Sequence, residues 1–166
     1  MDIDQSAKAR LERITGLLAG LPGPLGNGEL RVWVEHVGRD AMPRAVFDQL
    51  QTAGLLVRWY PQIPVDVPET AAEMMSRLDQ IDERAAAELF VALTSRTLAY
   101  RSRGRYDEAK ARELFAALCR LLDRDTIWWT NTDQTGWNPV NRHIFDAMPV
   151  ATGAQVTVAL LAFDED

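Results

Sequence analysis

Apolar side chains recur at helical spacing along much of this 166-residue chain, and that pattern limits the folds open to it. Side chains three and four positions apart share one face of an α-helix, so an apolar stripe of this kind must pack against another element. The stretch that follows Asp107 has the widest such stripe, formed by Ala111, Leu114, Phe115, Leu118, Leu121 and Leu122. We therefore expect helices to supply most of the core.

Further stretches show the same spacing and carry helix start or stop signals. Proline is favoured in the first turn of a helix, aspartate at the N-cap and glycine just beyond the last turn. The predicted helices cover residues 5–20, a segment from Asp40 and Pro43 to Gly54, a segment that begins at Pro68, one capped by Asp82, and a short one over 139–148.

Alternating apolar and polar residues predict strands at two places. Leu30, Val32 and Val34 alternate with more polar neighbours over residues 30–36, and a second strand is expected over 55–60. The spacing of residues 155–163 fits a strand or a helix, and their β-branched side chains favour the strand. The sequence thus predicts an α+β fold: a single globular domain over 1–166, mostly helical, with a small two- or three-stranded sheet.

Composition and charge indicate a compartment and a kind of partner. The single cysteine, Cys119, cannot form an internal disulfide, which favours the cytoplasm. Acidic residues and the prolines at 22 and 24 interrupt the N-terminal apolar stretch, so we expect neither a secretory signal nor a membrane span. The net charge of −6 argues against general nucleic-acid binding by the surface as a whole and suits a protein partner that is basic.

The stretch over 125–143 is the first candidate site, because it combines tryptophans with amide, carboxylate and imidazole groups. An indole face can stack on a sugar or nucleobase while neighbouring polar groups fix its orientation. The candidate ligand-binding residues are Trp128, Trp129, Asp133, Trp137, Asn138, Arg142 and His143. The alternative is that the tryptophans are core residues, since an indole buries a large apolar area.

The same stretch imitates half of a calcium-binding loop. Oxygen-bearing residues alternate over 131–135 and Gly136 follows, but Arg142 stands where a bidentate glutamate would complete the site. We predict no metal site and no cofactor.

Arginines and tyrosines gather in a second candidate site, over 100–106. Tyr100, Arg101, Arg103 and Arg105 are its candidate residues for binding an anion or a partner. Arginine can hold a phosphate or carboxylate with two hydrogen bonds while tyrosine stacks nearby. The alternative is a solvated helix face in which the arginines pair with nearby glutamates.

No residue is assigned a catalytic role. Cys119 lies beside an apolar stripe, where a buried thiol stays protonated, and no serine has a nucleophile-elbow context. The best prediction is a non-catalytic, cytoplasmic partner-binding module, such as a regulatory, adaptor or toxin-neutralising protein with an acidic surface. The alternative is a protein or enzyme that binds a sugar or nucleotide-like ligand through the 125–143 loop.

Overall fold

The computed structural model describes residues 3–57, 66–132, 139–140 and 145–164. Within these ranges the chain forms five α-helices and seven β-strands, with 41% of residues helical and 24% in strands. All seven strands belong to one sheet, and every strand pair in it is antiparallel. The α+β class is confirmed, but the expectation of a mostly helical chain with a two- or three-stranded sheet is wrong.

The order of the strands places the last strand of the chain in the middle of the sheet. Across the sheet the order is β1 (Gly23–Leu25), β2 (Gly28–Glu35), β7 (Thr157–Asp164), β6 (Val150–Thr152), β4 (Ile127–Thr130) and β3 (Asp79–Ile81). The remaining strand, β5 (Phe145–Ala147), pairs with β7 on the same side as β6. β7 is therefore flanked by β2 along one edge and by β5 and β6 along the other.

The strands β5 and β6 hold one register against β7 and are separated at Pro149. Ala147 lies opposite Ala162 and Val150 opposite Ala159, so no residue is inserted between the two strands. Proline has no N–H and interrupts the ladder there. β4 pairs with β6 alone, so beyond Trp129 the sheet divides between β4 and β5.

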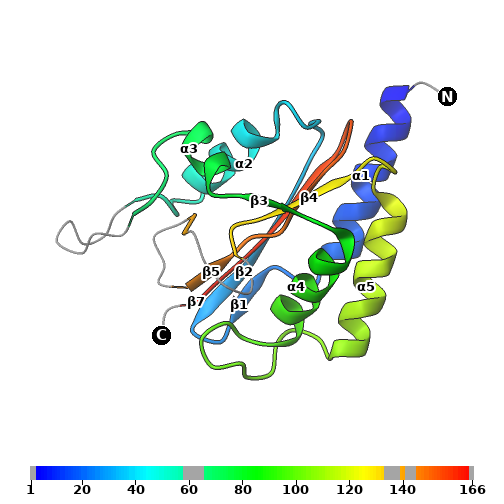
Figure 1. Ribbon diagram of the computed structural model, residues 1–166. Helices are drawn as coiled ribbons and strands as arrows, with labels where there is room; N and C mark the ends of the chain where they lie inside the picture. The colour runs from blue at the N-terminus through cyan, green and yellow to red at the C-terminus, as the bar shows by residue number, and fades with distance from the viewer. Residues whose placement is uncertain (1–2, 58–65, 133–138, 141–144, 165–166) are drawn as a thin grey trace.

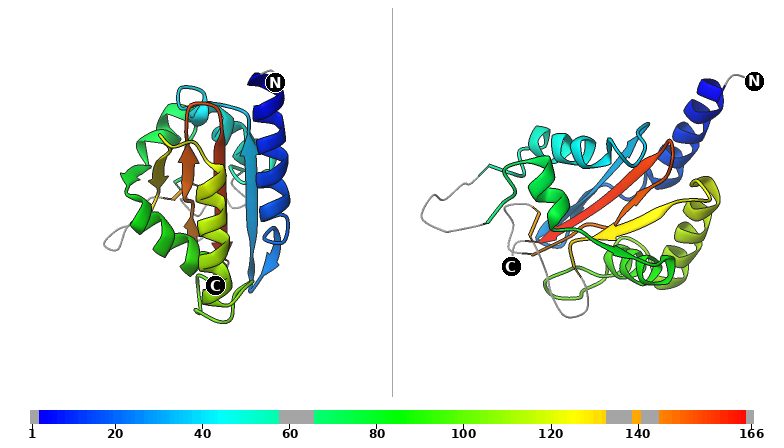
Figure 2. Two further views of the ribbon diagram at one scale, coloured as in Figure 1. Left: turned by 90° about the vertical axis from the view of Figure 1, so that its right-hand side faces the viewer. Right: turned by 45° about the horizontal axis from the view of Figure 1, so that its top comes forward.

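Helices cover both faces of the sheet (Figures 1 and 2). One face carries α1 (Ile3–Leu18), α4 (Glu83–Ser95) and α5 (Glu108–Leu121), and the other carries α2 (Met42–Thr52) and α3 (Ala71–Ser76). Since successive side chains of a strand point to opposite faces, β7 contributes to two cores at once. Val158, Leu160 and Ala162 pack toward α1, α4 and α5, while Leu161 and Phe163 pack toward α2 and α3.

Aromatic rings link the helices of the first core to the sheet. Phe90 of α4 contacts Phe115 of α5 with ring centroids 5.4 Å apart, and Phe115 contacts Trp128 of β4 at 5.3 Å. Aromatic pairs at such distances add a modest stabilisation to that of area burial. Trp128 is thus a core residue that joins β4 to the helical layer.

Two predicted helix caps are confirmed. The Asp82 carboxylate accepts a hydrogen bond from the Ala85 N–H at 2.7 Å, and Asp107 accepts one from the Lys110 N–H at 2.8 Å. Each caps an otherwise unpaired N–H of the first helical turn. None of the helices in the described part of the chain combines the length and the apolar character that crossing a bilayer requires.

Two other predictions from the sequence differ from the structure. Leu55 and Leu56 lie in a turn after α2 rather than in a strand, and the rest of the predicted 55–60 strand from residue 58 lies outside the described residues. The expected helix over 139–148 contains the strand β5 instead, because pairing with β7 decides the conformation of this short segment. The predicted C-terminal strand is confirmed as β7.

Truncating β7 on either face should destabilise the fold. Leu160 and Leu161 are 3% and 0% exposed and lie in different cores, so Leu160→Ala and Leu161→Ala should each lower the free energy of unfolding by about 2–5 kcal/mol. Val57, which is 59% exposed, provides the control, and Val57→Ala should change it by less than about 0.5 kcal/mol. Urea denaturation measures all three. A small loss for either leucine would contradict the two-sided packing of β7.

Candidate functional site

A buried polar pair, Asn131 and Asp146, lies where the sheet divides between β4 and β5. The Asn131 amide nitrogen donates to Asp146 Oδ1 at 2.5 Å, and the Asn131 carbonyl oxygen accepts from the Met148 N–H at 2.8 Å. Asn131 is 1% and Asp146 4% exposed. A carboxylate at this depth must be hydrogen-bonded to be tolerated, so the pair fixes how the two branches of the sheet sit against each other.

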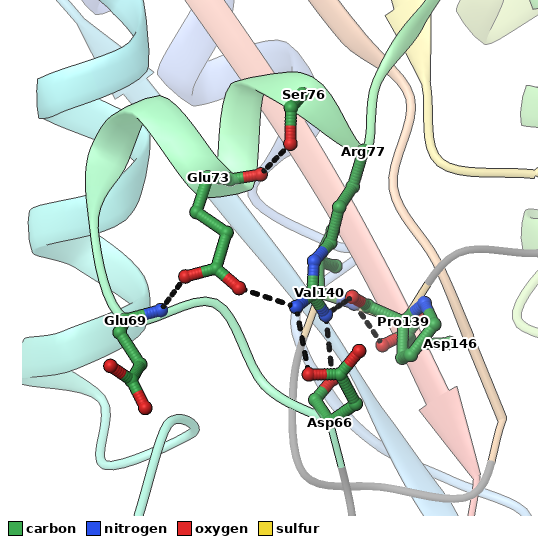
Figure 3. Close-up of polar contacts among 8 residues, drawn as sticks. All are labelled: Asp66, Glu69, Glu73, Ser76, Arg77, Pro139, Val140 and Asp146. Atoms are coloured by element: carbon green, nitrogen blue, oxygen red, sulfur yellow. Dashed lines mark hydrogen bonds and ion pairs between the residues drawn. The ribbon is translucent and has the colours of Figure 1, made fainter.

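The same carboxylate holds the short described segment 139–140. Asp146 Oδ2 accepts from the Val140 N–H at 2.9 Å, and the Pro139 carbonyl accepts from Arg77 Nη1 at 2.7 Å (Figure 3). Val140 is fully buried. The far part of the tryptophan-rich stretch is therefore anchored from two sides, by the end of α3 and by β5.

Arg77 is the centre of this anchor. Its guanidinium also donates to the Asp66 carbonyl at 2.6 Å, to the Asp66 carboxylate at 3.1 Å and to the Glu73 carboxylate at 3.0 Å (Figure 3). The Arg77 side chain is only 11% exposed, and a planar guanidinium can serve all of these acceptors at once.

The carboxylate of Glu73 is held in its ionised form. The Glu69 backbone N–H lowers the pKa of Glu73 most, through a hydrogen bond of 2.8 Å, and Arg77 lowers it further. A carboxyl group whose pKa falls on folding stabilises the fold above its unfolded pKa, and this is lost as the pH falls through the folded value. The contribution of Glu73 to stability is therefore lost in acid, below its ordinary value of 4.5.

A groove runs beside the divided sheet, along α4, and is the candidate binding site. It consists of two adjoining hollows of about 470 and 580 Å³ that share Leu89 and Thr132. Leu89, Leu93, Leu98, Ile81 and Ala147 give it apolar walls. We call it the α4 groove.

Arginines lie at both ends of the α4 groove. Arg84 lies at one end, and Arg96 and Arg101 lie at the other. Within the described part of the chain, Arg84 and Arg101 have no carboxylate partner, and Arg96 approaches Glu108 only to 3.9 Å. The carboxylates at the groove, other than the buried Asp146, are already engaged: Asp82 caps α4, and Glu88 contacts Arg112 at 3.3 Å.

The predicted arginine site is a tight hairpin that follows α4. Thr97 and Ser102 exchange hydrogen bonds, Arg96 forms a bridge with Arg103, and Arg101 adopts a left-handed conformation with φ of 50°. A non-glycine residue in this region is uncommon and needs support from its surroundings. Here the Asp164 carboxylate supplies part of it by accepting the Ala99 N–H at 3.1 Å.

The four residues predicted for this site lie in different environments. Arg101 lines the α4 groove, Arg103 is exposed, and Tyr100 is 62% exposed at the tip of the hairpin. Arg105 instead donates to the carbonyls of Leu21 at 3.3 Å and Pro24 at 2.8 Å, which ties the hairpin to the turn after α1 and to β1. Arg105 therefore has a structural contact that the sequence pattern did not indicate.

The residues predicted in the tryptophan-rich stretch are only partly described. Trp128 is buried in the first core, while Trp129 points to the opposite face, is half-buried, and has an indole N–H without a hydrogen-bond partner in the described part of the chain. Asp133, Trp137, Asn138, Arg142 and His143 lie outside the described residues. The stretch does reach the α4 groove, because Thr132 lines both of its hollows.

Sequence reasoning missed the residues that shape this region. Asn131 and Asp146 are fifteen positions apart and carry no motif, and Arg84 and Arg96 look like ordinary helix-surface arginines. One signal was present: Leu89 and Arg96 are seven positions apart, so they fall near one side of the segment that is capped by Asp82.

Comparison of the chain with models of known protein families, with curated proteins and with solved structures finds no match. In the described ranges, no three histidine, cysteine, aspartate or glutamate side chains are grouped so that they could hold a metal ion. The function must therefore be inferred from the geometry of the chain.

Replacing Arg77 should loosen the anchor. Arg77→Lys keeps the charge but loses the planar fork, so it should lower the free energy of unfolding by about 1–2 kcal/mol, and Arg77→Ala by about 2–4 kcal/mol. Arg44→Ala is the matched control, because Arg44 pairs with Asp48 on the exposed side of α2 and should contribute less than about 0.5 kcal/mol. Equal free energies of unfolding for Arg77→Lys and the unchanged protein would show that the planar guanidinium of Arg77 is not needed for stability.

The thiol of Cys119 should react slowly. Burial raises its pKa from 9.0 to about 11, with a smaller contribution from the negative charge of Glu83. At pH 8 the thiolate fraction of Cys119 is then about a hundredfold lower than that of a thiol with the ordinary pKa. The greater nucleophilicity of a more basic thiolate offsets part of the resulting loss of reactivity. Alkylation by iodoacetamide should be about tenfold slower in the native protein than in urea. Equal rates would contradict this assignment.

Proposed function

We propose that the protein is a non-catalytic, cytoplasmic partner-binding module whose α4 groove binds an extended, acidic segment of another protein. The observation that carries the proposal is the combination of apolar walls with a rim on which Arg84 and Arg101 have no acidic partner in the described part of the chain. An apolar pocket with a few convergent charged groups is the common form of a binding site.

The length of the groove favours a peptide segment. Arg84 lies in the first turn of α4 and Arg96 is its C-cap residue, twelve positions further along, which corresponds to about 18 Å along the helix axis. An extended chain covers this distance with about five or six residues. Two carboxylates at that spacing would each meet an arginine, and apolar side chains between them would contact Leu89 and Leu93.

The expected partner differs from the one favoured by net charge. The chain as a whole carries −6, which suits a basic partner, but the rim of the α4 groove has three arginines against the two carboxylates of Asp82 and Glu88. Short-range pairing depends on the charges at the contact, because surface charges further apart than about 8–10 Å are largely screened at physiological salt. The proposal therefore specifies an acidic segment.

A small anionic molecule is the second candidate ligand. The hollow that contains Arg96 and Arg101 measures about 470 Å³, within the range of roughly 300–1,000 Å³ common for ligand pockets. Thr132 of the tryptophan-rich stretch lines this hollow, which keeps the predicted sugar or nucleotide-like ligand as a proposal.

Charge reversal at the rim tests the proposed function. An array of labelled hexapeptides, each with a carboxylate residue at both ends and apolar residues between, is screened by fluorescence anisotropy. Arg96→Glu combined with Arg101→Glu should weaken binding at least tenfold. Arg13→Glu combined with Arg124→Glu changes the net charge equally on exposed arginines away from the groove and should stay within twofold.

Two outcomes would reject the peptide site. One is that no hexapeptide binds. The other is that both double variants lose affinity equally, which would show a general charge effect rather than a site.

A further inference from the structure

The outer edge of β2 has no neighbouring strand over residues 31–35 in the described part of the chain. β1 pairs with β2 only from Gly28 to Leu30, and β7 occupies the opposite edge along Glu29–Glu35. The last five residues of the eight-residue strand β2 therefore have a paired strand on one edge only. This region does not belong to the α4 groove, which lies beside β4 on the far side of β7.

The register of the hairpin identifies the backbone groups at this edge. Gly26 and Asn27 form a two-residue turn, with Gly26 at φ of 61°, so Leu25 and Gly28 exchange hydrogen bonds. Antiparallel pairing alternates along a strand. The N–H and C=O groups of Val32 and Val34 therefore point away from β7, toward the open edge, while those of Arg31 and Trp33 point to β7.

The open edge lies at the base of a hollow between two helices. This hollow has a volume of about 260 Å³. Thr15, Leu18, Ala19 and Pro22 line it on the side of α1, and Gln49 of α2 lines it on the other side, next to Val32–Glu35. Exposed edges are usually blocked by prolines, bulges or inward-pointing charges. Residues 31–35 contain neither a proline nor a bulge in the register, and their two charged side chains already have partners: Arg31 contacts Glu29 at 3.1 Å, and Glu35 accepts a hydrogen bond from Gln49.

A second copy of the chain does not suit this edge. A two-fold axis that pairs β2 with β2 antiparallel would place both α1 helices on the same face of the joined sheet. α1 lies beside the β2 edge of the sheet (Figure 2, left), so the two helices would compete for the same space. A single extended segment brings no helix with it.

We propose that the edge of β2 over Arg31–Glu35 binds an extended segment of a partner protein as an additional antiparallel strand. Side chains that lie opposite each other across two strands interact, so opposite charges are favoured there. The segment then carries a basic residue opposite Glu35, an apolar or aromatic residue opposite Trp33 and an acidic residue opposite Arg31. The residues opposite Val34 and Val32 face Thr15 and Ala19 and are apolar and compact.

The free protein provides the first part of the test. In the uniformly ¹⁵N-labelled chain, the amides of Val32 and Val34 should exchange with solvent at least a hundredfold faster than those of Arg31 and Trp33, which bond to β7. Slow exchange at Val32 and Val34 in the monomer would show that the edge is already closed. The same slow exchange in a dimer, detected by sedimentation, would assign the edge to a second copy; either result overturns the proposal.

The second part uses the blocked peptide Lys-Val-Tyr-Val-Glu, titrated to millimolar concentration. It should slow exchange at Val32 and Val34 at least tenfold. N-methylation of its second and fourth residues removes the N–H groups that face β2 and should abolish this protection. N-methylation of the third residue alters an N–H that points away from β2, so the protection of Val32 and Val34 should remain. Equal effects of the two modifications, or no protection by the parent peptide, would reject the added strand.

Reversal of the charges tests the orientation of the segment. The protein with Arg31→Glu and Glu35→Arg should prefer Glu-Val-Tyr-Val-Lys over the parent peptide, whereas the unchanged protein prefers the parent. An unchanged preference in the variant would contradict the antiparallel register.

Discussion

Burial of β7 on both faces is the constraint on which the rest of the structure depends. All eight of its residues are buried, although it is the last strand of the described chain. A strand covered on both faces requires helices above and below it, and a paired strand along each edge satisfies its backbone groups. The two helical layers, together with β2 on one edge and β5 and β6 on the other, meet this requirement.

The division of the sheet beside β7 has a structural and a functional consequence. β4 pairs with β6 but not with β5. Between β4 and β5, the contact is made by the hydrogen bond of Asn131 with Asp146 rather than by strand pairing. Polar groups at this depth stabilise a fold only when their hydrogen bonds are satisfied, which explains why both oxygens of Asp146 have partners. The end of β4 near the division is also where Thr132 meets α4, so the α4 groove and the anchored segment 139–140 arise from one feature.

The two proposed binding surfaces use different physical interactions. The α4 groove depends on side chains, with arginines around apolar walls, whereas the β2 edge depends on the backbone groups of Val32 and Val34. They lie on opposite sides of β7 in the strand order, so a ligand at one leaves the other accessible. A partner-binding module with both would contact its partner through two short extended segments.

The sequence by itself determined the elements whose signals are local. The helices capped by Asp82 and Asp107 and the strand near residues 30–36 were predicted, because capping and side-chain periodicity act within a few residues. Tertiary structure decided the rest. Strands of three or four residues such as β3, β4, β5 and β6 are too short to show a period, and only pairing with neighbours far along the chain makes them strands. The opposite faces taken by Trp128 and Trp129, and the contact of Asn131 with Asp146, followed from that pairing and left no local pattern to read.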